Sequence, residues 1–160
     1  MSAVAPPAAE LPPPPPAPAE RGERIVRVDR YSREDIENFA VACHDRNPLH
    51  SDDALAQRTR FGEVIASGQH TSSMLLGLVI SRFAHGPDGR AREVLLLHVN
   101  FAFRAPIFAN EDIQLSWRVA EVNWNPKLDG HVLVLEGGAS TARARPALVA
   151  RGTLLVKATH

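Results

Sequence analysis

The chain of 160 residues lacks several features that mark whole classes of proteins. Its single cysteine, Cys43, excludes an internal disulfide, and no apolar run approaches the roughly 18–20 residues that a membrane-spanning helix needs. Eighteen basic and eighteen acidic residues balance, so no excess of positive charge points to nucleic acid or to an anionic membrane. The first residues have neither a basic region nor an uninterrupted apolar stretch, so they do not form a secretory signal. We therefore expect a cytoplasmic protein that binds neither nucleic acid nor membrane.

Patterns of metal-binding residues are also missing, although the chain has seven histidines. His44 and His50 are not spaced as His-x-x-x-His, no glutamate accompanies them, and Cys43 stands alone, so we expect no bound metal. Cys43 falls on the apolar face of a predicted helix and is expected to be buried as a small hydrophobic residue. Gly137 and Gly138 lack the strand–turn–helix context of a phosphate-binding loop and are interpreted as a bulge or bend.

The sequence divides into a tail and one domain. Residues 1–22 are rich in proline and alanine and are predicted to be a disordered tail, while residues 23–160 are predicted to form the domain. Residues 1–20 hold eight of the thirteen prolines, and such a segment cannot bury enough apolar surface to offset the entropy lost on ordering. Two roles stay open for it: a dispensable tail, or an extended ligand for an aromatic groove in a partner.

The first half of the domain has the patterns of helices. Ser32 is a candidate N-cap for a helix over residues 33–43, and Asp53 for a short helix over residues 54–59. A longer helix is predicted from residue 68 to about residue 83; it is apolar around much of its circumference and should therefore be buried.

The second half changes to the alternation that is typical of strands. Four such stretches predict strands, and a fifth candidate precedes the first helix: residues 95–103, 113–119, 132–135, 148–156 and 25–28. Helices followed by a strand meander predict an α+β fold with an antiparallel sheet.

Asp45-Arg46-Asn47-Pro48-Leu49-His50 is the stretch that bears most directly on chemistry. It places a carboxylate and an imidazole five residues apart across a turn, because Asn favours turns and Pro fixes its own φ and restricts the residue before it. Two titratable groups held at the ends of a rigid loop suit proton transfer. The residues alone leave an alternative open, in which an Asx-turn leads into a helix and His50 is an ordinary polar residue.

Two separated elements together resemble the MaoC-like family, which includes R-specific enoyl-CoA hydratases and small acyl-CoA dehydratases. The first runs from Phe39 to His50 and contains Asp-x-Asn-Pro-x-His; the second is Phe61-Gly62-Glu63-Val64-Ile65-Ala66-Ser67-Gly68, which opens the long helix. The resemblance extends loosely over residues 24–157. It implies a hotdog fold, in which a curved antiparallel sheet wraps a long central helix, and a homodimer with an acyl tunnel at its interface.

The resemblance also implies roles for single residues. Asp45 and His50 match the catalytic pair, which handles the water added to C3 of an enoyl thioester and the proton delivered at C2. Gly68 matches a glycine whose backbone N–H polarises the thioester carbonyl, a role suited to the unpaired donors and positive dipole of a helix N-terminus. Asn47 would be structural or would orient the pair. We expect a hydro-lyase that hydrates a trans-2-enoyl-CoA, or dehydrates a 3-hydroxyacyl thioester, without a cofactor.

Some positions depart from the family pattern. His44 stands where the family often has glycine, Gln69 and His70 stand where it often has apolar residues, and Leu76 falls where some hydratases have a serine. His70 either lines the thioester pocket or caps the helix. These departures favour an alternative, a non-catalytic hotdog protein that binds acyl thioesters or serves assembly, whereas the intact Asp and His favour an enzyme. A hotdog thioesterase is a third option, without a separate nucleophile pattern in its support.

Overall fold

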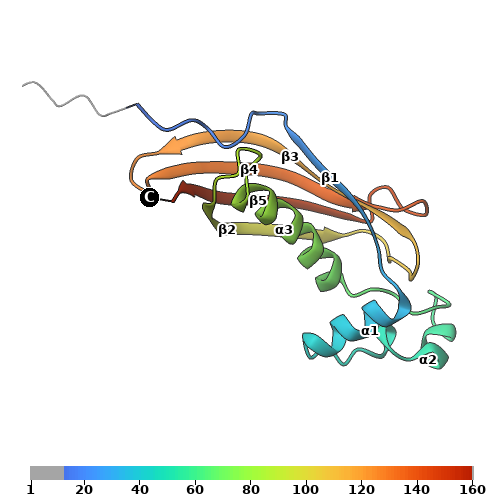
Figure 1. Cartoon of the computed structure of the whole chain (residues 1–160). Helices are drawn as coiled ribbons and strands as arrows, with labels where there is room; N and C mark the ends of the chain where they lie inside the picture. The colour runs from blue at the N-terminus through green and yellow to red at the C-terminus, as the bar shows by residue number, and fades with distance from the viewer. Residues whose placement is uncertain (1–12, 160) are drawn as a thin grey trace, which may run out of the picture.

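The computed structural model describes residues 13–159 and shows one long helix, α3, against a curved antiparallel sheet of five strands (Figure 1). The strand order is β1-β3-β4-β5-β2, so β1 and β2 are the edges. The elements are β1 (Arg24–Arg30), α1 (Arg33–Ala42), the 3₁₀ helix η1 (Pro48–His50), α2 (Asp53–Gln57), α3 (Gly68–Ala84), β2 (Arg92–Phe103), β3 (Asp112–Asn125), β4 (Gly130–Ser140) and β5 (Leu148–Ala158). The predicted α+β class is confirmed.

The two short helices begin at acidic or hydroxyl caps. Ser32 and Asp35 form a capping box at the start of α1, in which each side chain accepts the backbone N–H of the other residue. The cap of α2 is Asp52, which accepts the N–H of Leu55 at 2.9 Å. The prediction that Asp53 is this cap was therefore wrong by one residue, since either carboxylate precedes a helical stretch and sequence alone does not choose between them.

The long helix α3 is fixed to the sheet by apolar packing and one buried hydrogen bond. Leu75, Val79 and Phe83 recur every four residues and are fully buried. Trp117 of β3 is 1% exposed, and its indole N–H donates to the carbonyl of Leu75 at 2.7 Å. The apolar packing and this hydrogen bond together fix the position of α3 on the sheet. Within residues 13–159 no helix is long and apolar enough to cross a membrane.

Two β-bulges curve the sheet around α3. The register shifts between Leu96 and His98 in β2 and between Val119 and Glu121 in β3. The predicted bulge at Gly137-Gly138 was wrong, because both residues pair with β3 in regular register. A Cβ atom at Gly137 would lie 2.5 Å from the indole of Trp117. Glycine there makes room for the buried ring.

The folded chain begins before the predicted boundary at residue 23. Ala19 is 8% exposed and belongs to the core, and the N–H of Gly22 donates to the carbonyl of Val119 at 2.8 Å. Residues 13–22 are therefore not wholly a disordered tail, and the prediction for residues 1–12 lies outside the described residues. Cys43 also differs from expectation: it is exposed at the end of α1, because the apolar face of that short helix ends before it.

Candidate active site

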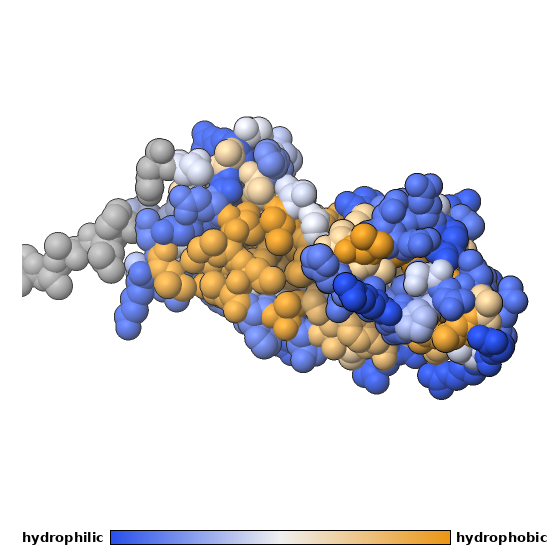
Figure 2. Space-filling view, turned by 90° about the horizontal axis from the view of Figure 1, so that it is seen from below, coloured by the Kyte–Doolittle hydropathy of each residue, from blue (hydrophilic) through white to orange (hydrophobic). Residues whose placement is uncertain are grey.

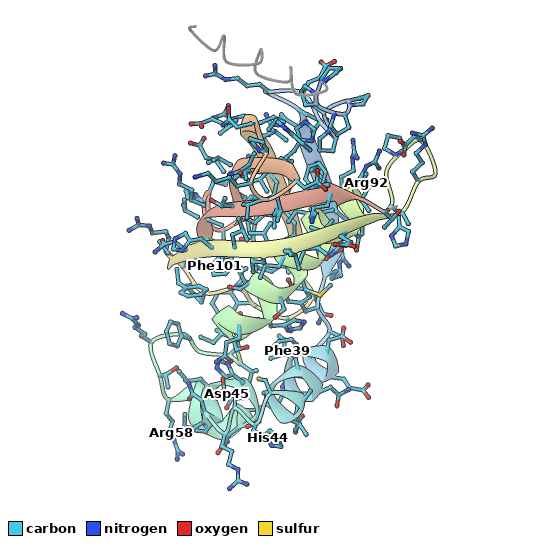
Figure 3. The ribbon with its side chains drawn as sticks, turned by 90° about the vertical axis from the view of Figure 1, so that its left-hand side faces the viewer. Phe39, His44, Asp45, Arg58, Arg92 and Phe101 are labelled. Atoms are coloured by element: carbon cyan, nitrogen blue, oxygen red, sulfur yellow. The ribbon has the colours of Figure 1, made fainter. Side chains whose placement is uncertain are left out.

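The segment with the predicted acid–base pair lies at one end of the molecule, where α1, η1 and α2 project beyond the sheet (Figures 1 and 3). Asp45 follows the end of α1, and its N–H donates to the carbonyl of Ala40 at 2.8 Å. The chain turns there through His44, which has a φ of 59°. This left-handed conformation is the one that glycine adopts without strain, whereas it is unfavourable for an L-residue such as His44.

Asn47 and Pro48 shape the loop between the two titratable groups. The N–H of Asn47 donates to Oδ1 of Asp45 at 3.0 Å, and Oδ1 of Asn47 accepts the N–H of Leu49 at 3.2 Å. Pro48 occupies the first position of η1, where a missing N–H is harmless. The Asx-turn of the alternative interpretation is thus present, and the same turn holds the Asp45 carboxylate toward His50.

His50 is 6% exposed and is held on both sides of its ring. Nδ1 lies 2.8 Å from the carbonyl oxygen of Ile65, and Nε2 lies 3.6 Å from Oδ2 of Asp45. Because a carbonyl only accepts hydrogen bonds, Nδ1 carries a proton and Nε2 of a neutral ring presents its lone pair to Asp45. The 3.6 Å separation of Nε2 and Oδ2 exceeds a direct hydrogen bond, so a donor placed to one side of the pair can bond to both acceptors.

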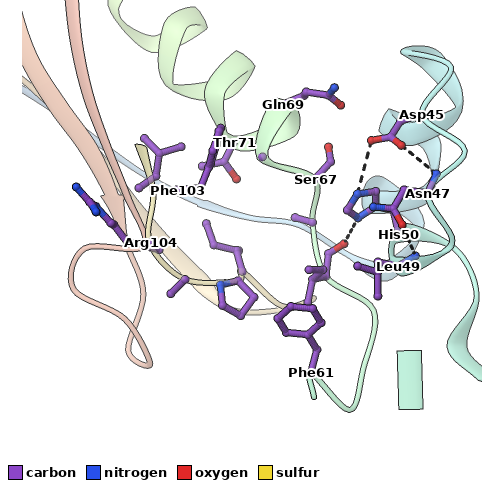
Figure 4. A pocket seen from close by; sticks show the side chains of 18 of the residues that line it. Asp45, Asn47, Leu49, His50, Phe61, Ser67, Gln69, Thr71, Phe103 and Arg104 are labelled. Atoms are coloured by element: carbon purple, nitrogen blue, oxygen red, sulfur yellow. Dashed lines mark hydrogen bonds and ion pairs between the residues drawn. The ribbon is translucent and has the colours of Figure 1, made fainter. Parts of the chain in front are cut away.

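A cavity of about 500 Å³ brings the two predicted elements together (Figure 4). Asp45, Asn47 and His50 line it from one side. Gly68, the first residue of α3, also lines it. The wall is otherwise mainly apolar, with two arginines and three other polar side chains: Leu49, Arg60, Phe61, Ile65, Ala66, Ser67, Gln69, Thr71, Phe103, Arg104, Ala105, Pro106, Ile107, Ala147 and Leu148.

Gly68 is the first residue of α3, and its N–H has no partner within the helix. The N-cap Ser67 accepts the N–H of His70 at 3.2 Å and so leaves the N–H of Gly68 free of the cap. A Cβ atom at Gly68 would lie 2.6–2.9 Å from three carbons of the Phe103 ring. A larger residue at position 68 would therefore have to displace that ring, whereas the φ of Gly68 is not in the left-handed region and needs no glycine.

His70 lies outside the wall of this cavity. Its ring is stacked between those of Tyr31 and Phe39, with centroids 4.0 and 4.4 Å away. Burial lowers the pKa of His70, an effect that the nearby Asp35 carboxylate partly opposes, and burial raises the pKa of Tyr31 to about 12. The structure thus gives no geometric support for His70 as a substrate-binding residue. Its ring instead joins α1, which precedes Asp45, to the first turn of α3.

Several residues of the cavity were not found from the sequence. Phe61 belongs to the Phe-Gly motif but was given no role. The others lie at or next to strand ends far along the chain: Phe103, Arg104, Ala147 and Leu148. Their only sequence signal is the end of an alternating stretch, and that signal does not show which part of the folded protein the strand end approaches. Among residues 13–159 no three His, Cys, Asp or Glu side chains are grouped as metal ligands.

Comparison with known proteins gives the family. Residues 16–135 match the family described as the MaoC like domain. The chain is 31% identical over 91 residues to 3-hydroxybutyryl-CoA dehydratase of Methylorubrum extorquens, which covers 57% of this chain and 54% of that protein. It is 27% identical over 94 residues to the (R)-specific enoyl-CoA hydratase of Aeromonas caviae, which covers 59% of this chain and 66% of that protein. The chain thus spans about half to two thirds of the length of these relatives.

Solved structures confirm the predicted hotdog fold. The (R)-hydratase from A. caviae involved in PHA biosynthesis superposes with a TM-score of 0.72 at 22% identity, over 88% of this chain and 98% of that one. A monoamine oxidase regulatory protein from Archaeoglobus superposes with the same TM-score, 0.72, at 25% identity, over 89% of this chain and 93% of that one. With a fold of this kind and a family match over most of its length, the chain belongs to the MaoC-like domain family.

Proposed function

We propose that the protein is a hydro-lyase that adds water to a trans-2-enoyl thioester, or removes it from a 3-hydroxyacyl thioester. The observation that carries this proposal is the 3.6 Å separation of Asp45 Oδ2 and His50 Nε2 in a mainly apolar cavity that Gly68 also lines. The names of the curated relatives, a dehydratase and a hydratase of CoA thioesters, support the same reaction class.

In the proposed reaction the catalytic pair holds the attacking water. A water about 2.8 Å from both Oδ2 of Asp45 and Nε2 of His50 donates one hydrogen to each, which leaves an oxygen lone pair directed into the cavity. As the oxygen bonds to C3, one of the two groups takes the water proton. The carbanion equivalent at C2 takes up a proton from the pair, so the product gains one water in total.

The N–H of Gly68 supplies the third element. Attack at C3 places negative charge on the thioester oxygen, and a helix N-terminus offers both an unpaired donor and a positive dipole end for it. One preorganised donor of this kind contributes on the order of 2–4 kcal/mol to lowering the barrier. The reaction needs no cofactor in this scheme, because every step is a proton transfer or an addition next to a polarised carbonyl.

The test is a panel of trans-2-enoyl-CoA substrates, followed by the loss of enoyl absorbance. Asp45→Asn keeps the size of the side chain but removes the base, and His50→Ala removes its partner; each should lower turnover by roughly 10²–10⁴. The double variant should cost little more than the worse single one, since residues that act as a unit are not additive. Asp53→Asn, an exposed carboxylate outside the cavity, is the matched control.

The outcomes separate the remaining functions. A folded wild-type protein that hydrates none of the substrates would overturn the hydro-lyase and leave the acyl-thioester-binding protein. Release of free thiol from acyl-CoA, measured with a thiol reagent, would instead identify a thioesterase. If Asp45 only shaped the turn, Asp45→Asn would lower the melting temperature while the folded fraction kept its turnover.

We also propose that two copies associate through β2. Figure 2 shows a continuous apolar area over β2 and α3, and Leu95, Leu96 and Leu97 of the edge strand are 51%, 40% and 48% exposed. An edge strand with unpaired backbone groups beside such an area favours a two-fold partner. Sedimentation should give a species of twice 17.4 kDa, and Leu96→Asp should shift it to the monomer. A wild-type protein that stays at 17.4 kDa at micromolar concentration would overturn the dimer.

A further inference from the structure

Phe103 is the largest side chain that closes the cavity from the side of the sheet. It ends β2, faces the catalytic pair across the cavity in Figure 4, and remains 58% exposed. The ring of Phe103 packs on the backbone of Gly68, the proposed oxyanion donor. Packing in the hydrophobic core does not account for a side chain with this much exposure. We therefore asked what its ring does to the space for a substrate.

The backbone of Phe103 is held in place by the sheet. Phe103 pairs with Leu148 across the β2–β5 ladder, and the next two residues, Arg104 and Ala105, both donate their N–H groups to the carbonyl of Ala147, at 2.8 and 3.1 Å. The Phe103 backbone therefore cannot withdraw without breaking the end of the ladder. The ring can then leave the cavity only by rotation of the side chain.

The ring occupies the space next to the proposed oxyanion donor. Three of its carbons would come within 2.6–2.9 Å of a Cβ atom at Gly68, so the ring covers the side of Gly68 where a side chain would point. A thioester whose oxygen accepts the N–H of Gly68 lies beside this ring, because Gly68 and Phe103 line the same cavity and are in contact. The ring thus limits the width of the acyl group at this position.

We propose that Phe103 determines acyl-group specificity by restricting the site to short, unbranched acyl thioesters. The inference rests on the proposed thioester site but not on turnover. Truncation of the ring should open the cavity beside Gly68 and admit longer or branched chains. Each additional methylene that a pocket accepts or rejects changes discrimination by about tenfold or more.

The experiment compares wild type with Phe103→Leu and Phe103→Ala, on short (butenoyl) and longer (octenoyl) trans-2-enoyl-CoA. The ratio of kcat/KM for octenoyl-CoA to that for butenoyl-CoA should rise at least about tenfold in Phe103→Ala, with Phe103→Leu between. Phe101→Leu is the matched control, because Phe101 lies on the same strand face, 6.5 Å from Phe103 between ring centroids, but does not line the cavity. Its ratio should stay that of wild type.

Binding of saturated analogues separates this proposal from the reaction. Calorimetric titration with butanoyl-CoA and octanoyl-CoA should show the same shift in preference whether or not the protein turns over enoyl-CoA. A wild-type protein that binds butanoyl-CoA but hydrates nothing would overturn the hydro-lyase and leave the role of Phe103 standing. Unchanged ratios in both Phe103 variants, an equal loss for both chain lengths, or no binding of either analogue would overturn the role of Phe103.

A second pair of variants tests the contact itself. Gly68→Ala should lower affinity and turnover in wild type, because its methyl group must displace the ring of Phe103. In the Phe103→Ala background the methyl group has room, so Gly68→Ala should cost at least about tenfold less there. Equal costs in the two backgrounds would show that the ring does not control this space. Sedimentation of each variant checks that the oligomeric state is that of wild type.

Discussion

Replacement of His70 by phenylalanine measures how much the buried aromatic stack makes the fold depend on pH. Burial lowers the pKa of His70, so the ring is neutral in the folded protein, whereas a histidine in the unfolded chain titrates near 6.5. Below about pH 6.5 the unfolded chain binds a proton that the folded chain does not, and the free energy of unfolding falls as the pH falls. The loss of stability with falling pH ends only when the pH is below the pKa of His70 in the folded protein.

The magnitude follows from this linkage. One proton of difference changes the free energy of unfolding by at most about 1.4 kcal/mol per pH unit. Asp35 is on α1 and favours the charged ring, so it reduces the effect of burial without reversing it. Phenylalanine keeps a ring between Tyr31 and Phe39, and Nδ1 of His70 has no hydrogen-bond partner to lose in the described part of the chain.

The assay is urea denaturation of wild type and His70→Phe at about pH 7.5 and about pH 5.5. Wild type should lose more stability than the variant on acidification, by up to about 1.4 kcal/mol. His131 also has its pKa lowered by burial and stays in both proteins, so the difference between them isolates His70. If the larger phenyl ring overpacks the stack, stability falls at both pH values but the difference persists. Equal losses in the two proteins would refute the argument.

Three further predictions concern the fold. His44→Gly should raise the free energy of unfolding by roughly 0.5–1 kcal/mol in urea denaturation, because the φ of 59° at this position strains an L-residue, and a decrease would contradict this. Removal of residues 1–12 should leave the melting temperature unchanged, whereas removal of residues 1–20 should lower it, since Ala19 packs in the core; equal melting temperatures would argue against that packing. Trp117→Phe should cost about 2–3 kcal/mol, because it removes a buried hydrogen bond to Leu75 and leaves a gap; calorimetric unfolding would test this, and a cost below about 0.5 kcal/mol would contradict it.

The sequence predicted the elements whose signals are local. The capped helix after Ser32 and the long apolar helix from Gly68 lie close to their predicted bounds, because periodicity and caps act within a few residues. The five strands were all predicted, but β3 and β4 continue to Asn125 and Ser140, well beyond the predicted ends at residues 119 and 135. The Asp45–His50 loop was also predictable, since Asn and Pro shape the backbone wherever they stand. That both residues line a common cavity with Gly68 is an observation of the structure, whose catalytic meaning remains a proposal.

The sequence missed what depends on contacts between distant residues. The ring of Phe103 meets Gly68 only because β2 returns beside the start of α3, and no pattern within either segment states this. Gly137 has the appearance of a bulge in sequence, and only the position of Trp117 on the neighbouring strand shows why a glycine is there. His70 could point to the cavity or to α1, and its choice depends on two rings from other elements.

The partner of His50 at Ile65 has a consequence for how substitutions affect the site. The imidazole is oriented by a main-chain oxygen, which every amino acid supplies, so no substitution at position 65 deletes that acceptor. A neutral carbonyl also adds no full charge on that side of the ring, whereas the other ring nitrogen faces the carboxylate of Asp45. Side chains at position 65 can therefore reshape the cavity wall without removing the contact that orients the imidazole.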